Sequence, residues 1–187
     1  MDCIFSNTIS ESDYVELSSL CSIASGKRPP SKTDVMNRDN NIPLYGASKI
    51  MGWCNGYLYD EPILITGRVG THGIVQKSFG KSWPSDNTLV IKTNNYGYVY
   101  ECLKNIDFSV LNCGSTQPLI TQSALGNVQV PVISDTELKR FNQRIESLIT
   151  IQNRLIEENT ALSMIRDLLL PKLMSGEIDV SNLDLSS

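Results

Sequence analysis

The spacing of hydrophobic and polar residues along this 187-residue chain changes near residue 134. Before that point, apolar residues occur in short runs broken by Gly, Pro and Asn, a pattern typical of β-strands joined by turns. After it, apolar residues recur with a helical period, and neither Gly nor Pro occurs before Pro171. We therefore expect a β-rich domain over residues 1–133, a long helix over 134–171 and a short tail over 172–187.

The first region is expected to be mainly β. Residues 94–108 place Tyr98, Cys102 and Ile106 at helical spacing and are expected to form a helix. The alternation of short strands and turns predicts an α+β fold, built on a twisted, mainly antiparallel β-sheet with short helices. The expected strands are rich in Ile, Val, Tyr and Trp and cover residues 42–45, 53–59, 63–66, 73–79, 88–93 and 128–130.

A capping pattern marks the start of the second region. Ser134 is followed three positions later by Glu137, a spacing at which each side chain bonds the other's backbone N–H. Beyond it, an apolar residue recurs at every seventh position: Phe141, Leu148, Leu155, Leu162 and Leu169. A second column, four residues after the first four of these, consists of Ile145, Gln152, Asn159 and Arg166. Spacings that alternate between four and three form the seam of a coiled coil.

Two interpretations of this seam are open. In one, the helix folds back on its own domain and its polar column faces water. In the other, it dimerises with the helix of a second chain, and Gln152 and Asn159 select register and orientation at some cost in stability. A helix of about 36 residues is about 54 Å long, at 1.5 Å per residue. Because that length exceeds the width of a small domain, we favour pairing with a second chain.

The composition is that of an ordinary globular protein, with 41% hydrophobic and 19% charged residues. Its five cysteines are widely spaced and lie apart from the single histidine, His72, so no zinc site is expected. Unpaired thiols fit a reducing cytosol. The N-terminus lacks the features of a signal peptide, and no stretch approaches the ~18 apolar residues of a membrane span. We expect a cytoplasmic protein with no metal or cofactor of its own.

Charge is distributed unevenly along the chain. The net charge of −4 argues against a nucleic-acid partner. Residues 26–92, however, contain nine basic and five acidic residues, or nine minus five, +4. Residues after 132 contain six basic and nine acidic residues, or six minus nine, −3. This asymmetry permits a basic face on the first domain.

No catalytic motif is recognised. The Asn/Asp-Pro-Pro-aromatic signature of amino-group methyltransferases is absent, and residues 25–28 lack the spacing of a Walker A motif. A magnesium nuclease core is approximated only by Asp86 followed by Lys92, with valine where a second acid is needed. We therefore expect a protein that is not an enzyme, and a metal-dependent nuclease is the least favoured alternative.

Four segments, in order, resemble the specificity subunit of type I restriction–modification systems. They are residues 17–29, residues 42–70, residues 114–131 and residues 169–178, the last reading Leu-Leu-Pro-Lys-Leu-Met-Ser-Gly-Glu-Ile. The last segment is the most specific, and together the four cover essentially the whole chain. Members of this family carry two target-recognition domains, each followed by a long helix, whereas this chain has one of each and no internal repeat. It therefore resembles a half-subunit, and the other half is expected from a second copy.

The resemblance implies a non-catalytic subunit that reads double-stranded DNA for modification (methyltransferase) subunits. Those subunits would hold S-adenosylmethionine, and a restriction subunit would join through them. In a homodimer with antiparallel helices both half-sites are the same, so the expected target is an interrupted palindrome. The alternative is a coiled-coil protein-interaction module without DNA binding, which the acidic net charge favours.

Candidate DNA contacts follow from the chemistry of phosphates and base edges. Lys and Arg neutralise phosphates, and amide side chains pair with adenine. Each basic candidate has a plain alternative role as a solvated surface charge. Arg68 is flanked by Gly67 and Gly70, which would let it approach a duplex closely. The candidates are Lys27, Arg28, Lys49, Arg68, Lys77, Lys81, Ser115, Thr116 and Gln117.

A further site is implied by the resemblance at the end of the long helix. Proline disfavours a helical conformation in the residue before it, so Pro171 is expected to end the helix. The residues around it would either stop the helix and pack locally or dock onto the modification subunit. The docking candidates are Leu170, Pro171, Lys172 and Leu173.

Overall fold

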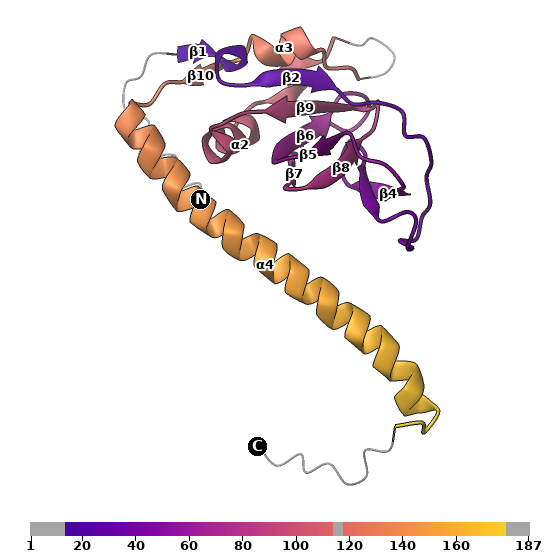
Figure 1. Ribbon diagram of the computed structural model, residues 1–187. Helices are drawn as coiled ribbons and strands as arrows, with labels where there is room; N and C mark the ends of the chain where they lie inside the picture. Colours follow the sequence, from indigo (N-terminus) through magenta and orange to yellow (C-terminus); the bar gives the residue numbers. More distant parts are fainter. Residues whose placement is uncertain (1–13, 114–117, 179–187) are drawn as a thin grey trace. The chain divides into compact units, whose positions relative to one another are not determined.

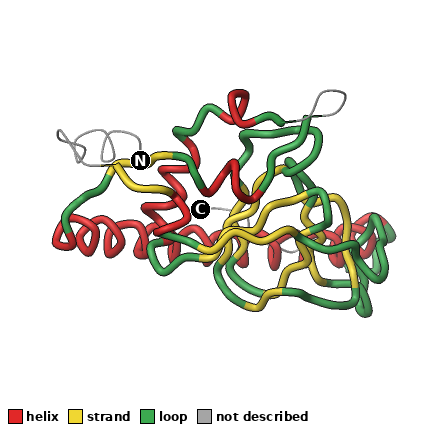
Figure 2. The backbone as a smooth tube through the Cα atoms, turned by 90° about the horizontal axis from the view of Figure 1, so that it is seen from above, coloured by secondary structure: helices red, strands yellow, loops and turns green. Residues whose placement is uncertain are grey.

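The β-rich region expected from the sequence forms three sheets in the computed structural model, which describes residues 14–113 and 118–178. The structure falls into two compact units, Met1–Ile145 and Glu146–Ser187. The first unit holds the strands, the short helices and the first turns of the long helix α4 (Asp135–Met174). The second holds the rest of α4 (Figure 1). Figure 2 shows most of the strands gathered together and joined by long loops.

The elements other than α4 are short. The strands are β1 (Tyr14–Glu16), β2 (Ser22–Ser25), β3 (Ile42–Tyr45), β4 (Ile50–Cys54), β5 (Tyr59–Asp60), β6 (Ile63–Gly67), β7 (Gln76–Ser78), β8 (Lys81–Pro84), β9 (Thr88–Lys92) and β10 (Gln129–Pro131). The helices are α2 (Tyr96–Lys104) and α3 (Gln122–Gly126), with 3-10 turns η1 (Leu17–Ser19) and η2 (Phe108–Leu111).

Antiparallel pairing dominates the sheets. One four-stranded sheet has the order β2-β9-β6-β7, a second has the order β4-β3-β8-β5, and β1 pairs with β10. Among the described strands, only β3 and β8 pair in parallel. This arrangement confirms the predicted α+β class with mainly antiparallel sheets and short helices.

The core is centred on β6, whose five residues are all buried. A run of Ile, Leu and Thr suits a strand that is covered on both faces. Ile63 and Ile65 pack in one cluster with Val90 of the same sheet and Tyr45 of the other four-stranded sheet. The two larger sheets therefore share a hydrophobic core, and the loops at their ends are held by it.

The start of α4 packs on the first unit. The predicted capping box is confirmed: Glu137 N–H donates to Ser134 Oγ (3.3 Å), and Ser134 N–H donates to Glu137 Oε2 (3.1 Å). One turn later, the Phe141 ring meets the Tyr98 ring of α2 edge-on, with centroids 5.9 Å apart. Ile145 lies against Gly97, where a methyl group would come within 2.2 Å of its Cγ2 atom. The helix thus begins as part of the domain.

Most expected strands are present, with shifted limits. The expected strand over residues 53–59 is in fact two strands, β4 and β5, because Asn55 and Gly56 turn the chain between them. Strand β7 is shorter than expected because Gly73, at φ +84°, lies in the left-handed region. Strands β1, β2 and β8 and the five-residue α3 were not expected.

The long helix continues three residues past the proline that was expected to end it. Pro171 lies inside α4, which ends at Met174. Gly176 has φ +74°, and its N–H donates to the carbonyl oxygen of Leu173 (3.2 Å). A left-handed glycine of this kind satisfies the last carbonyls and ends a helix, so glycine rather than proline sets the boundary. Among the described residues, no helix is long and apolar enough to cross a membrane.

Candidate nucleic-acid interface

Five strand ends meet at one end of the first unit. They are the C-terminal ends of β2, β3, β6 and β8 and the N-terminal end of β9, which neighbour one another in the sheets. The pairings that place them together are Ser25 with Leu89, Gly67 with Thr88, and Tyr45 with Pro84. We call this region the loop end and define it as residues 26–32, 46–49, 67–73 and 85–87.

The tight turn between β8 and β9, which we call the central turn, ties these loops together. Thr88 closes the turn, because its N–H (3.0 Å) and its Oγ1 (2.7 Å) both donate to the carbonyl oxygen of Ser85. Ser85 N–H donates to the Tyr45 carbonyl oxygen of β3 (2.9 Å). Arg68 N–H donates to the Asn87 carbonyl oxygen (2.8 Å). The turn is therefore held from β3 on one side and from the loop after β6 on another.

The end of β2 closes on the same turn from a third side. Gly26 N–H donates to the Thr88 carbonyl oxygen (3.1 Å), and Lys27 N–H donates to that of Pro84 (3.0 Å). A methyl group at Gly26 would lie 2.1 Å from the Ser85 carbonyl oxygen and 2.5 Å from that of Pro84. Only glycine permits this close approach of two backbones, so the position of Lys27 depends on it.

Four of the six basic residues predicted to contact DNA lie at the loop end. Lys27, Arg28 and Lys49 are exposed, and Arg68 is partly buried. The loop end contains five basic residues, Lys32 included, and one acidic residue, or five minus one, +4. A local charge of +4 on a chain with a net charge of −4 favours the approach of an anionic partner at this end.

A hollow of about 570 Å³ opens at the loop end between the segment after β2 and the central turn. It is lined by Arg28, Pro29, Pro30, Ser31, Lys32, Met51, Ser85, Asp86 and Asn87. Lys32 also lies 3.8 Å from Asp34, an exposed pair of little energetic weight. Cationic, amide and carboxylate groups thus share one concave surface, a mixture that suits polar recognition.

The other two predicted basic residues lie elsewhere on the first unit. Lys77 Nζ stands 4.8 Å from the centroid of the Tyr100 ring of α2, and burial lowers the pKa of its ammonium group. Lys81, at the start of β8 and therefore away from the loop end, stands 5.0 Å from the centroid of the Tyr57 ring. Both lysines have aromatic neighbours, and neither belongs to the loop end.

Ser115, Thr116 and Gln117 lie outside the described residues. The segments on either side of them are described. Gly70 N–H donates to the Pro118 carbonyl oxygen (3.2 Å), and Ile120 N–H donates to that of Arg68 (2.9 Å). The chain after these three residues is therefore bound to the loop end.

Three charged or amide residues that line the hollow at the loop end were not among the sequence candidates. The sequence pattern includes Lys32 only in the regional charge and Asp86 only in an approximate nuclease motif, and it does not single out Asn87. For Asp86 and Asn87, the available signal was their place in a Ser-Asp-Asn turn between two strands, since such residues favour turns. Nothing in the sequence alone indicated that this turn would lie at the centre of the other loops.

The predicted dimerisation residues divide into two groups along α4. Phe141 and Ile145 are buried, at 4% and 3% exposure, against α2 of their own chain, so they are not available to a second helix. This corrects their assignment to the dimerisation surface. The side chain of Gln152 lies outside the described residues. Farther along, the seam residues are exposed, namely Leu148, Leu155, Asn159, Leu162 and Leu169.

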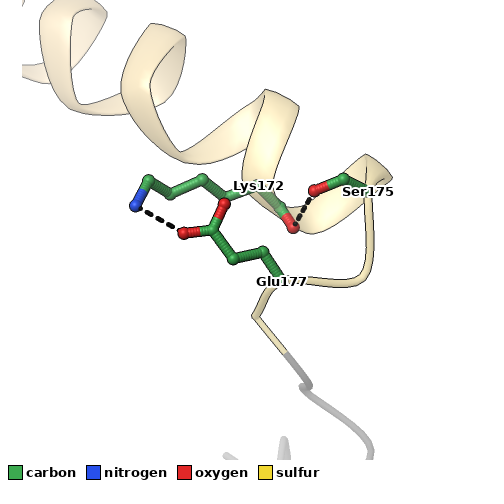
Figure 3. A network of polar contacts seen from close by, with 3 residues as sticks. All are labelled: Lys172, Ser175 and Glu177. Atoms are coloured by element: carbon green, nitrogen blue, oxygen red, sulfur yellow. Dashed lines mark hydrogen bonds and ion pairs between the residues drawn. The ribbon is translucent and has the colours of Figure 1, made fainter.

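The predicted docking residues occupy the exposed last turns of α4. Leu170, Pro171, Lys172 and Leu173 are all exposed. Figure 3 shows the contacts there: Lys172 Nζ lies 2.9 Å from Glu177 Oε1, and Ser175 Oγ donates to the Lys172 carbonyl oxygen (3.1 Å). These contacts fold the chain after the helix back onto its last turn.

His, Cys, Asp and Glu side chains are the groups that bear on catalysis and metal binding. Over residues 14–113 and 118–178, no group of three or more His, Cys, Asp and Glu side chains is arranged so that it could hold a metal ion. His72 Nε2 contacts the Arg68 carbonyl oxygen at 3.2 Å. Burial raises the pKa of the Cys21 thiol to about 11 and is the main cause that raises that of Cys102 to about 12. Both thiols are therefore protonated at neutral pH and are poor nucleophiles.

Comparison with known proteins identifies one family. The model described as "Type I restriction modification DNA specificity domain" matches residues 9–165. The chain is 25% identical over 131 residues to a putative type I restriction enzyme specificity subunit of Haemophilus influenzae, covering 66% of this chain and 34% of that protein. It therefore spans about a third of the length of this curated relative.

Solved structures of the same kind are similar in fold. The S subunit of a type I restriction–modification system from M. genitalium has a TM-score of 0.65 at 13% identity, covering 89% of this chain and 47% of that one. A second match, with a TM-score of 0.52 at 18% identity, comes from a study of complex assembly and conformational transition of the type I R-M system. It covers 86% of this chain and 45% of the other.

Proposed function

Because the chain belongs to the family of type I restriction modification DNA specificity domains, we propose that its first unit reads double-stranded DNA through the loop end. The family is the specificity component, not a catalytic one, of its complex, in agreement with the prediction that this protein is not an enzyme. Two copies, paired through α4, would read an interrupted palindromic target on behalf of methyltransferase subunits.

The observation that carries this proposal is the gathering of cations from loops far apart in the sequence. Lys27, Arg28, Lys49 and Arg68 come from three different loops that meet at the central turn. Phosphate contacts provide most of the affinity of DNA-binding proteins, and they require cations on one face. If each of these cations were only a solvated surface charge, there would be no reason for them to lie at the same end of the unit.

Self-pairing is supported by the unpartnered seam of α4. Leu148, Leu155, Leu162 and Leu169 recur every seventh residue, and their exposure ranges from 42% to 62%. An apolar column of this length on an exposed helix is typical of a coiled coil. Two linked readers gain affinity through effective concentration, so one domain alone is expected to bind DNA weakly.

The helix would also set the distance between the two half-sites. The part of α4 beyond the first unit, Glu146–Met174, is roughly 43 Å long at 1.5 Å per residue. At 3.4 Å per base pair this corresponds to about 13 base pairs as an upper bound on the half-site separation. The twofold axis of a homodimer would make the two half-sites inverted repeats.

Partner docking is assigned to the end of the same helix. Leu170, Pro171, Lys172 and Leu173 would contact the modification subunits, which would hold S-adenosylmethionine and transfer the methyl group, and a restriction subunit would join through them. These residues are exposed, and the chain after them folds back onto the last turn. Free thiols at Cys21, Cys54, Cys102 and Cys113 suit a complex that acts in the reducing cytoplasm.

The salt dependence of duplex binding tests the DNA-reading role. Wild-type affinity should fall steeply and log-linearly with salt, because phosphate contacts release counterions. Arg28→Ala and Arg68→Ala should each weaken binding and lower the slope by about 1. Lys81→Ala, which removes a cation away from the loop end, is the matched control and should change neither.

The second candidate is a coiled-coil interaction module that binds no DNA, and the net charge of −4 favours it. It predicts that no duplex is retained at any salt concentration, with or without modification subunits. It predicts the same oligomeric state as the first candidate, so only the binding measurement separates the two.

A further inference from the structure

The two central residues of the central turn combine a fixed backbone with unengaged side chains. Ser85 and Thr88 close the turn, and the backbone of Asn87 is held by Arg68, as described above. The side chains of Asp86 and Asn87 are exposed. Within the part of the chain that the structure describes, neither makes a hydrogen bond or an ion pair. Both line the hollow at the loop end.

Other loop residues of the same types behave differently in this molecule. Asn37 Oδ1 accepts from the backbone N–H of Asn40 (2.9 Å), and Asp107 Oδ1 accepts from that of Ser109 (2.9 Å). Asn112 Oδ1 accepts from Leu119 N–H (2.9 Å). Each of these side chains stabilises its own loop, which is the usual role of Asn and Asp in turns. The local structure of the central turn does not need the side chains of Asp86 and Asn87.

A rigid turn with free polar side chains is what base recognition requires. A recognition group must be held in place by its backbone, because a mobile group does not discriminate between bases. An asparagine amide can donate to N7 and accept from N6 of adenine, and an aspartate can accept from N4 of cytosine. A carboxylate among cations is repelled by phosphates, so contact with an exocyclic amino group is its favourable role on a DNA-facing surface.

From these observations, and resting on the proposed function, we propose that the central turn is a base-reading element in which Asn87 reads an adenine and Asp86 reads a cytosine. The cations around the turn, Arg28 and Arg68 among them, hold the flanking phosphates. This proposal assigns the sequence specificity of the domain to Asp86 and Asn87. Neither is basic, so a search for positively charged surface residues would not select them.

The test is a selection from duplexes that carry randomised blocks, using the full chain with and without its modification subunits. Retained DNA is sequenced for the wild type, for Asn87→Ala and for Asp86→Ala. Asn87→Ala should abolish the preference for adenine at one position of each half-site, by about tenfold or more, and leave the other positions unchanged. Asp86→Ala should do the same at one cytosine position. Asn87→Asp should move the preference at its position from adenine towards cytosine.

Asn94→Ala is the matched control, since Asn94 is exposed and follows the opposite end of β9. It should leave every position and the salt slope unchanged. Equal weakening on all sequences, or an unchanged profile, in Asn87→Ala and Asp86→Ala would overturn the assignment while DNA binding stood. Failure of the wild type to retain any duplex, with or without modification subunits, would overturn the proposed function and the assignment with it. Unchanged melting temperatures would establish that the variants are folded.

Discussion

The two units of this molecule treat their hydrophobic residues in opposite ways. In the first, Leu64, Ile65 and Ile91 are among many aliphatic side chains with 0% exposure. In α4 beyond Ile145, the described aliphatic residues are exposed, up to 68% for Leu168. Apolar surface is costly in water, at about 25 cal/mol per Å², so the first unit is stable by its own packing. The described aliphatic side chains of the second have no comparable burial, and the proposed self-pairing would provide it.

The change from buried to exposed aliphatic side chains takes place within a single helix, α4. Phe141 and Ile145 continue the seven-residue pattern of the seam, yet they pack on α2 of the same chain. The next seam residue, Leu148, is 45% exposed. One amphipathic pattern therefore has two surroundings in succession: its first residues anchor the helix to its domain, and its later residues are exposed.

The largest effect is expected from charges placed in the exposed seam. Changing Leu148 and Leu155 together to Asp puts two carboxylates into an interface that would otherwise exclude water, which is strongly unfavourable. The wild type should have the mass of two chains by light scattering, and the variant the mass of one. The control changes Thr150 and Met164 to Asp, each two residues beyond a seam position. It should remain a dimer, and a wild-type monomer would refute self-pairing.

Two isoleucines, one in each unit, test the difference in burial. Both are changed in the Leu148→Asp, Leu155→Asp variant, which is expected to be monomeric, so that stability does not depend on protein concentration. Ile65→Ala should lower the free energy of unfolding by about 2–5 kcal/mol, because Ile65 is fully buried. Ile165→Ala, at 51% exposure on α4, should change it by less than about 0.5 kcal/mol. Urea denaturation measures both. Comparable losses would mean that α4 packs on its own domain in the monomer.

Most of the fold was predictable because its signals are local. The strands over residues 42–45 and 63–66 are dense in β-branched and apolar residues, and the cap at Ser134 is a short pattern. The helix end was not predicted correctly, since a proline near the last turn is tolerated when a glycine just beyond it satisfies the final carbonyls.

The candidate site was predictable only in part, because it depends on long-range pairing. Residue type alone nominated Arg28 and Arg68, but equally Lys77 and Lys81, which lie elsewhere. The pairing of β2, β6 and β8 ends decides which cations meet, and no local pattern contains that pairing. The resemblance to a family gave the class of function, whereas the assignment of residues required the structure.

A smaller effect on stability is expected at the contact between α2 and the start of α4. Gly97→Ala would place a methyl group 2.2 Å from Ile145 Cγ2 and should destabilise the monomeric variant by about 1–3 kcal/mol through overpacking. Ile145→Ala removes that Cγ2 atom. The double variant Gly97→Ala with Ile145→Ala should therefore lose less free energy of unfolding than the sum of the two single variants, by about 1 kcal/mol. Simple additivity in urea denaturation would mean that α4 does not begin against α2.

The smallest effect concerns the cap that joins the domain to the helix. Ser134→Ala removes the acceptor for Glu137 N–H and should cost about 1 kcal/mol at neutral pH, whereas Thr136→Ala, at its exposed neighbour, should cost less. Hydrogen bonds from Ser134 lower the pKa of Glu137 below its usual value. A carboxyl group with a lowered folded pKa adds stability above its unfolded pKa of about 4.3 and loses it as the pH falls through the folded value. The difference between Ser134→Ala and the wild type should therefore shrink on acidification below about pH 4. An equal difference at neutral and acidic pH would mean that the carboxylate takes no part in the cap.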